Sequence, residues 1–463
     1  MFDVVPLSSE QLESLMLSIG LLGVLLLVGV LLRLVIPALR RFFIPAALIG
    51  GLIGIAAGPF ALGLVSEEMN ETWSAMGGIL IAFVFAPMLM GSKLPSIKEA
   101  AGVAAPHVLY SYLSTLALVG ASALVCVLLL TPVFGTHPLA ASLLEISWPG
   151  GHGTAAGMAP VFEQFGWQDG SSLALGLATF GLIFGIFGGM VLLNIASRRG
   201  QLRTSAPGGD QAGREDLLVD GDGEVQSVSR LHKASLDNLA FHFSLIMVAI
   251  LIGWALKALI DLVFTGVPLF PLAMIGGLLV QLVIQRTALS RIVDRRTFNQ
   301  IAGIALDFLV VAAVASIQLP VLLENLAAIV VLTVVAIVIS VVMFYVVGPR
   351  LFRTDWVENS IVNFGAMTGV SSVGLMLLRA ADPGLRTKAG EGFALRAPFS
   401  SPFVGGGLVT ALVPVVIVQF GNLAVGLGCV ALCAALLLVA KLTGLWRAPA
   451  GAVRTAGSQA TAV

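Results

Sequence analysis

Charged residues are scarce in this sequence: 11% of its 463 residues are Asp, Glu, Lys or Arg, whereas soluble domains carry about 25%. Hydrophobic residues make up 58%. So few charges cannot cover a water-facing surface, which excludes a soluble enzyme. The 25 basic and 25 acidic residues cancel, so the excess positive charge typical of nucleic-acid binding is missing. The composition predicts an all-α polytopic protein embedded in a lipid bilayer.

Cysteine is also scarce, and the motifs of several enzyme classes are absent. Cys126, Cys429 and Cys433 all lie in apolar runs, so we expect no disulfide framework. The sequence contains no phosphate-binding GxxxxGK[ST] loop and no zinc-binding HExxH motif. Acidic residues precede the first apolar run, where a signal peptide is basic, so we expect no cleaved signal. We therefore expect neither an ATP-driven pump nor an enzyme.

Long apolar stretches are the feature that the sequence has in abundance. A hydrocarbon core of about 30 Å needs about 20 apolar residues per helix. We predict eleven spans, at 14–37, 44–64, 72–91, 104–130, 172–196, 236–262, 267–286, 297–318, 323–348, 402–420 and 423–443. Two further stretches, 138–165 and 356–382, are apolar but broken by glycine, proline and polar residues. Because broken backbone at membrane depth must be buried in protein or line a cavity, we predict two re-entrant hairpins there.

The positive charges set the orientation of these spans. Counting both hairpins as re-entrant puts nearly all basic residues on one side, as cytoplasmic loops require. The basic residues on that side include Arg198, Arg199, Arg286, Arg291, Arg295, Arg296, Arg350, Arg353, Arg386, Lys388, Arg396, Lys441 and Arg447. We therefore expect an inner-membrane protein with its N-terminus outside and its C-terminus in the cytoplasm.

Two halves of the chain resemble each other. Residues 44–54 read IPAALIGGLIG and residues 270–280 read FPLAMIGGLLV, and charge gives the two segments opposite directions. GTAAGM in the first broken stretch stands opposite GVSSVG in the second. We predict an inverted repeat of five transmembrane helices plus one re-entrant hairpin each, with an extra C-terminal helix. Inverted repeats with paired broken segments are typical of secondary transporters, whose site lies at the repeat interface.

The repeat divides the chain into four parts. The first repeat covers residues 1–196, and a polar cytoplasmic linker covers 197–235. The second repeat covers 236–420, and an extra helix with a disordered tail covers 421–463.

The hairpin centres supply the candidate binding residues. Backbone amides freed at such breaks, together with hydroxyl and amide side chains, can bind a small anion. The candidates are Gly150, Gly151, His152, Gly153 and Thr154 in the first hairpin and Asn363, Thr368, Gly369, Ser371, Ser372 and Arg379 in the second. His152 is either a ligand-facing group or a residue bonded to a neighbouring carbonyl, and Arg379 either attracts an anion or pairs with Asp382.

One carboxylate lies in the middle of a predicted span. Asp307 stands in the run IAGIALDFLVVAAVA, and ionisable residues inside a membrane mark ion or substrate pathways. We predict that Asp307 is a sodium ligand or a proton site, against the alternative of a buried hydrogen-bonding role. Glu145, one helical turn before the first tip, is a further candidate.

The stretch Ile146-Ser147-Trp148-Pro149-Gly150-Gly151-His152-Gly153-Thr154, followed by Ala178-Thr179-Phe180-Gly181-Leu182, resembles the glutamate:sodium symporter family. Its signature is a Gly-Gly-His-Gly-Thr turn followed by a helix with Ala-Thr-Phe-Gly-Leu. The resemblance implies Na⁺-coupled uptake of L-glutamate by a homodimer, through elevator-like movement of the hairpin-bearing part. Better-known members carry serine at Pro149, His-Cys at Asn363-Phe364 and Thr-Pro at Ser371-Ser372.

Taken together, the sequence predicts a sodium-coupled symporter of a small anionic solute, glutamate by resemblance. A proton-coupled or other carboxylate transporter on the same scaffold remains an alternative, in which His152 and Asp307 would titrate. A channel is the third hypothesis. In each of these readings we expect a membrane protein that does not bind nucleic acid.

Overall fold

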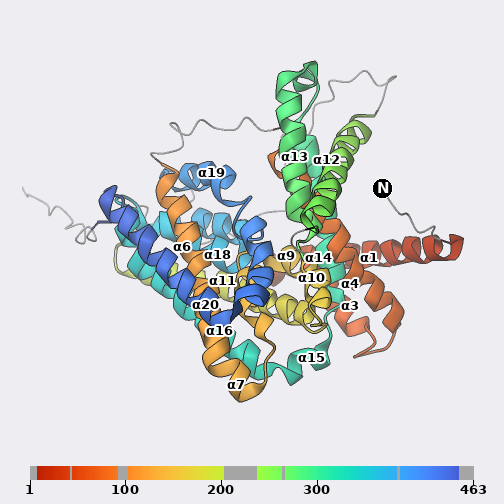
Figure 1. Ribbon diagram of the computed structural model, residues 1–463, viewed down its shortest axis with the longest axis horizontal. Helices are drawn as coiled ribbons and strands as arrows, with labels where there is room; N and C mark the ends of the chain where they lie inside the picture. Colours follow the sequence, from red (N-terminus) through yellow and green to blue (C-terminus); the bar gives the residue numbers. More distant parts are fainter. Residues whose placement is uncertain are drawn as a thin grey trace, which may run out of the picture.

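The computed structural model describes residues 8–41, 44–91, 103–202, 237–262, 266–382 and 386–447. Within these ranges every regular element is a helix, and ten helices are long and apolar enough to cross a membrane (Figure 1). This confirms the all-helical, polytopic membrane architecture. Most of the predicted linker at 197–235, and the tail after Arg447, lie outside the described residues.

The helices agree with most of the predicted spans. In the first half the main helices are α1 (Ser9–Val35), α3 (Ala46–Ala57), α4 (Glu67–Phe85), α6 (Ala105–Val125) and α11 (Gly170–Arg198). In the second half they are α12 (Asn238–Ile260), α13 (Leu269–Arg286), α14 (Arg295–Ala315), α16 (Leu326–Val342), α18 (Trp356–Ala381), α19 (Ala389–Ser400) and α20 (Leu408–Leu442).

Two elements, α3 and α19, differ from the predicted spans. The stretch 44–64 contains the 12-residue helix α3, which ends where Gly58 and Pro59 follow, because proline cannot continue the hydrogen-bond ladder. The predicted spans 402–420 and 423–443 agree with the structure, because α20 consists of two helices that meet at a kink at Gly421, where φ is 77°. Helix α19 was not predicted, because its twelve residues are too short and polar for the membrane-span criterion.

The long helices form two packed groups. Helices α1, α3, α4, α12, α13 and α14 contact one another, and α6, α11, α16, α18, α19 and α20 form the second group. Figure 1 shows the first group on the right and the second on the left. Helix α9 (Gly151–Gly157) contacts α11 in one group and α4 and α14 in the other. The first broken stretch therefore lies where the two groups meet.

Glycines make matching contacts in the two halves of the chain. A Cβ atom on Gly50 of α3 would collide with the carbonyl of Leu25 in α1, and one on Gly276 of α13 would collide with the carbonyl of Ala249 in α12. The next residues repeat the pattern. Gly51 packs against the Val314 side chain of α14, and Gly277 packs against the Ala86 carbonyl directly after α4.

The two halves also share an irregular helix turn. Helix α6 continues through a wide turn at Cys126–Leu130 into α7 (Thr131–Phe134), and α16 continues through one at Met343–Val347 into α17 (Gly348–Leu351). Each wide turn directly precedes a broken stretch.

The close approach of α12 and α13 predicts the effect of one added methyl group. Gly276→Ala would press its Cβ against the Ala249 carbonyl, so the helices must separate and the unfolding temperature of the detergent-purified protein should fall. Overpacking of this kind costs about 1–3 kcal/mol. Gly303→Ala in α14 is the matched control, because nothing lies within 4 Å of its added Cβ. Equal unfolding temperatures for the two variants would contradict the described packing.

Candidate functional site

The first broken stretch consists of short helices around a glycine turn. Helix α8 (Leu143–Ser147) follows a 3-10 turn at Pro138–Ser142, and α9 and α10 (Ala159–Gln164) follow the turn. Gly151 has φ 68°, a left-handed conformation that favours glycine. Helix α9 begins at Gly151 and has only seven residues, so its dipole is small.

The second broken stretch lies inside α18. The backbone leaves helical geometry at Gly369 and at Val370, which has φ 63° and ψ 174°. A Cβ on Gly365 would lie 2.6 Å from the Cα of Gly374, so the two halves of α18 fold back against each other. Val370 occupies a backbone region that is nearly exclusive to glycine, which costs about 1–3 kcal/mol. Such strain persists where the surroundings hold it, and it clusters at functional sites.

The two turns touch each other. A Cβ on Gly151 would lie 2.5 Å from Cγ1 of Val370. Helix α11 supports both turns from behind. His152 of the first turn hydrogen-bonds Thr179 of α11 (3.0 Å), and a Cβ on Gly181 of α11 would lie 2.7 Å from the Thr368 carbonyl of the second. The two signature segments, 150–154 and 178–182, are thus joined by the His152–Thr179 hydrogen bond.

A polar cavity of about 50 Å³ lies beside the paired turns. It is lined by Tyr110, Ser111, Ser114 and Thr115 of α6, Pro149 of the first turn, Asn363, Ala366, Met367 and Ser371 of α18, Arg396 of α19, and Ser401, Val404 and Gly405 of the following loop. In this conformation the cavity has room for a few water molecules or one small functional group. Elements from both halves of the chain therefore build a single site.

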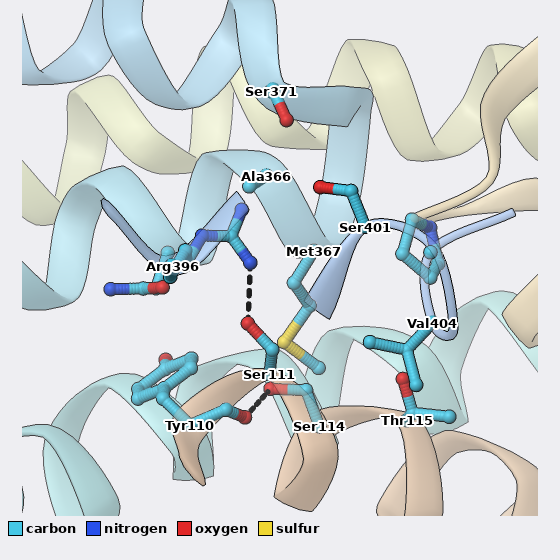
Figure 2. Close-up of a pocket in the computed structure, with 13 residues that line it drawn as sticks. Tyr110, Ser111, Ser114, Thr115, Ala366, Met367, Ser371, Arg396, Ser401 and Val404 are labelled. Carbon is cyan, nitrogen blue, oxygen red and sulfur yellow. Dashed lines mark hydrogen bonds between the residues drawn. The ribbon is translucent and has the colours of Figure 1, made fainter. Parts of the chain in front are cut away.

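Arg396 provides the positive charge of this cavity. Its side chain is 9% exposed and donates to the Ser111 hydroxyl (Figure 2). The guanidinium also stacks over Phe393, 4.0 Å from the ring centroid. No carboxylate among the described residues lies within ion-pair distance of Arg396. Burying an uncompensated charge is costly. A guanidinium in this position favours a carboxylate ligand, which it can bind with two parallel hydrogen bonds.

Three buried polar atoms of the lining residues have no hydrogen-bond partner among the described residues. They are the Tyr110 hydroxyl, Oδ1 of Asn363 and Nε of Arg396. Buried polar groups are nearly always paired, and exceptions mark places where a ligand or water binds. The cavity therefore offers donors and an acceptor to a small polar molecule.

Glu145 lies directly behind the cavity wall. Its Oε1 accepts hydrogen bonds from Thr115, Thr410 and the Gly405 amide, each at 3.0 Å. Its Oε2 is buried and has no partner among the described residues. These three donors offset part of the cost of burying a charged carboxylate. The carboxylate and the two threonine hydroxyls are oxygen ligands, which suit a hard cation such as Na⁺.

The structure brings together some of the predicted site residues. Asn363 and Ser371 line the cavity, Gly150 and Gly151 form the first turn beside it, and Thr154 lies against Gly406. Gly369 forms the second turn. The Gly153 backbone packs toward Leu309 and Ile81, away from the cavity.

Other predicted site residues lie elsewhere. His152 is held by Thr179, and Thr368 donates to the Phe364 carbonyl (2.9 Å) and faces α11. Neither lines the cavity. Ser372, Arg379 and Asp307 are exposed and also lie outside its wall.

The sequence alone does not indicate the main charge of the cavity. Arg396 was counted among the cytoplasmic loop cations, but α19 carries it into the protein interior. The signal that could have found it is the run SSPFVGGG at 400–407, a third glycine-rich turn following a short helix. The hydroxyl face of α6, with Ser111, Ser114 and Thr115, was also missed.

Comparison with known proteins gives two findings. Residues 11–357 match the family model described as sodium/glutamate symporter. A protein named sodium/glutamate symporter from Haemophilus influenzae is 29% identical over 197 residues, which are 40% of this chain and 45% of that protein. The chain thus spans less than half the length of this curated relative.

The contact between the two turns predicts a coupling between Gly151 and Val370. Gly151→Ala adds a Cβ against the Val370 side chain and strains the backbone, so the unfolding temperature should fall. Val370→Gly should remove both the collision and the strain at 370. The double variant should therefore be more stable than Gly151→Ala alone, as thermal unfolding in detergent would measure.

Gly135→Ala is the matched control, because Gly135 has φ 66° but nothing within 4 Å of an added Cβ. It reports the backbone strain alone. The changes in unfolding temperature caused by Val370→Gly and Gly135→Ala should simply add, since the two sites share no contact. If the change in stability were the same in both backgrounds, the turns would not touch in solution.

Proposed function

We propose that this chain, which belongs to the sodium/glutamate symporter family, is a secondary active transporter. It couples Na⁺ entry to the uptake of a small anionic solute. L-glutamate is the proposed substrate, from the family and from the name of the H. influenzae relative. The observation that carries the proposal is the buried Arg396, which faces a polar cavity beside two helix breaks and has no carboxylate partner among the described residues.

In this proposal the substrate carboxylate binds the Arg396 guanidinium. The hydroxyls of Tyr110 and Ser401 lie at the cavity and donate further hydrogen bonds. Because the cavity measures about 50 Å³, the loop at 401–407 or the second turn must move outward to admit a molecule of glutamate size. Closure around the substrate then excludes water, which strengthens each charge–charge interaction inside.

The coupling Na⁺ is proposed to bind at Glu145. This replaces Asp307, which is exposed on α14 and does not line the cavity. Glu145 shares Thr115 and Gly405 with the cavity wall, so an ion at Oε2 would fix two segments that the substrate also contacts. Such sharing makes the binding of ion and substrate mutually dependent.

The architecture is proposed to be an inverted repeat that works as an elevator. The matching contacts of Gly50 and Gly276, and the wide helix turns before both breaks, support the repeat. The group formed by α6, α11, α16, α18, α19 and α20 would carry the site and slide against the other group. We further propose an inner-membrane homodimer with its N-terminus outside and its C-terminus cytoplasmic, from the family and the charge distribution.

Uptake by proteoliposomes tests the function. Purified protein should accumulate labelled L-glutamate when Na⁺ is high outside, and should not accumulate it when choline replaces Na⁺. Accumulation driven by a proton gradient without Na⁺ would instead support the proton-coupled alternative. Strictly downhill flux under every gradient would indicate a channel.

Removing the cavity charge predicts a loss of substrate affinity. Arg396→Gln should raise the KM for glutamate roughly 10- to 100-fold, because a charge-assisted hydrogen bond contributes about 1.5–3 kcal/mol. Arg396→Lys should retain part of the affinity, since lysine keeps the positive charge but lacks the planar guanidinium that can form two parallel hydrogen bonds to a carboxylate. Arg379→Gln is the control, because Arg379 lies outside the cavity wall. An unchanged KM in Arg396→Gln, or an equal effect in Arg379→Gln, would contradict the assignment.

Removing the buried carboxylate predicts a loss of sodium affinity. Glu145→Gln keeps the size of the side chain but removes its charge, so the Na⁺ concentration for half-maximal uptake should rise about tenfold or more, equivalent to about 1.4 kcal/mol. Glu358→Gln is the matched control, because Glu358 is also fully buried but does not line the cavity. If both variants kept the sodium dependence of the wild type, Glu145 would not hold the ion.

A further inference from the structure

A row of buried polar side chains connects α6 to the first half of α18. Nε2 of His107 lies 3.0 Å from Oδ1 of Asn359, and Nδ1 of His107 lies 2.7 Å from Nδ2 of Asn363. All three side chains are at most 9% exposed. Only Asn363 among them lines the cavity, so the row ends at the proposed substrate site.

The donor and acceptor of each hydrogen bond in this row can be assigned by starting from Asn359, the residue farthest from the cavity along the row. Nδ2 of Asn359 donates to the Thr354 carbonyl (3.2 Å) and the Asp355 carbonyl (2.9 Å). Its Oδ1 is therefore the atom that faces His107, and it can only accept. Nε2 of His107 must carry the proton, which leaves Nδ1 of the neutral ring as an acceptor.

The acceptor on His107 fixes the orientation of the Asn363 amide. Nδ2 of Asn363 donates one hydrogen to Nδ1 of His107 and the other to the Asn359 carbonyl (2.7 Å). Both amide hydrogens are used, so Oδ1 is the atom left for a ligand. It has no partner among the described residues and can only accept.

The His107 ring has little freedom to turn. It packs against Phe352 with ring centroids 4.7 Å apart. Gly392 of α19 leaves room for the ring, since a Cβ there would lie 2.6 Å from Nε2. Gly392 lies one helical turn before Arg396, so α19 both accommodates His107 and supplies the guanidinium. A flipped Asn363 amide would lose the hydrogen bonds to His107 and to the Asn359 carbonyl.

We propose that His107 is a positioning residue that holds Oδ1 of Asn363 toward the substrate, where it accepts a hydrogen bond from the substrate ammonium group. The inference rests on the proposed function and adds a positioning residue to its site. Arg396 binds a carboxylate, and Asn363 binds an N–H donor in the same cavity. The site therefore selects an α-amino acid over a dicarboxylate of the same length that lacks the ammonium.

Ligand binding to the full-length protein, purified in detergent with Na⁺, tests this selectivity. L-glutamate and glutarate, which has the same five-carbon dicarboxylate skeleton without the ammonium, are titrated while thermal stabilisation is measured. The wild type should bind glutamate at least tenfold more tightly than glutarate. His107→Leu should weaken glutamate binding about tenfold and change glutarate binding less than twofold, because the Asn363 amide is no longer held.

Two further variants keep the test decisive. His107→Gln has one acceptor and one donor group in its side chain, so it should recover part of the preference for glutamate. Asn363→Ser removes the amide but leaves the His107–Asn359 bond, and it should lose the preference even if His107→Leu does not fold.

Three results overturn the inference. The first is an equal loss of affinity for both ligands in His107→Leu and Asn363→Ser, which would indicate a purely structural role. The second is an unchanged preference in both variants. The third is a wild type that binds glutarate as tightly as glutamate, which would leave the proposed anion transport intact. A wild type stabilised by neither ligand would contradict the proposed function as well.

Discussion

The contact between the Gly151 turn and the Val370 turn is the interaction on which the site depends. A helix break frees backbone amides and carbonyls, and hydrocarbon cannot satisfy them. Here each break is covered by the other and by α11, whose Gly181 and Gly185 let the second turn approach closely. Because the turns must meet, segments more than 200 residues apart are held in one place, and the strained backbone of Val370 is tolerated.

The polar cavity follows from this contact. The fold brings the hydroxyl face of α6, the first half of α18 and the end of α19 around the paired turns, and Glu145 ties the glycine loop at 405–407 to the first of them. One positive and one negative group are thus buried near each other without being paired, since Arg396 bonds Ser111 and Glu145 bonds two threonines. An anion and a cation binding together would neutralise both, which gives the proposed symport its electrostatic basis.

The sequence predicted the features that depend on local chemistry. Hydropathy located nearly all long helices. The glycine and proline residues at 149–151 and 369 located both helix breaks, because the conformations open to the backbone depend on the residue type at that position. The features that it did not predict are tertiary. Whether Arg396 lies in a loop or in a cavity depends on how α19 packs, and whether Asp307 faces a pathway or the surface depends on which face of α14 is covered. Thr368 was expected in the pocket, but it points to α11 because the second turn rotates it there.

The central claim is that the substrate carboxylate is held by Arg396 beside the two turns. The most direct measurement is an experimental structure of the full-length protein with L-glutamate and Na⁺ bound. We expect a glutamate carboxylate within hydrogen-bond distance of the Arg396 guanidinium. Glutamate bound beside Arg379 or Asp307, with Arg396 still bonded only to protein, would contradict this assignment.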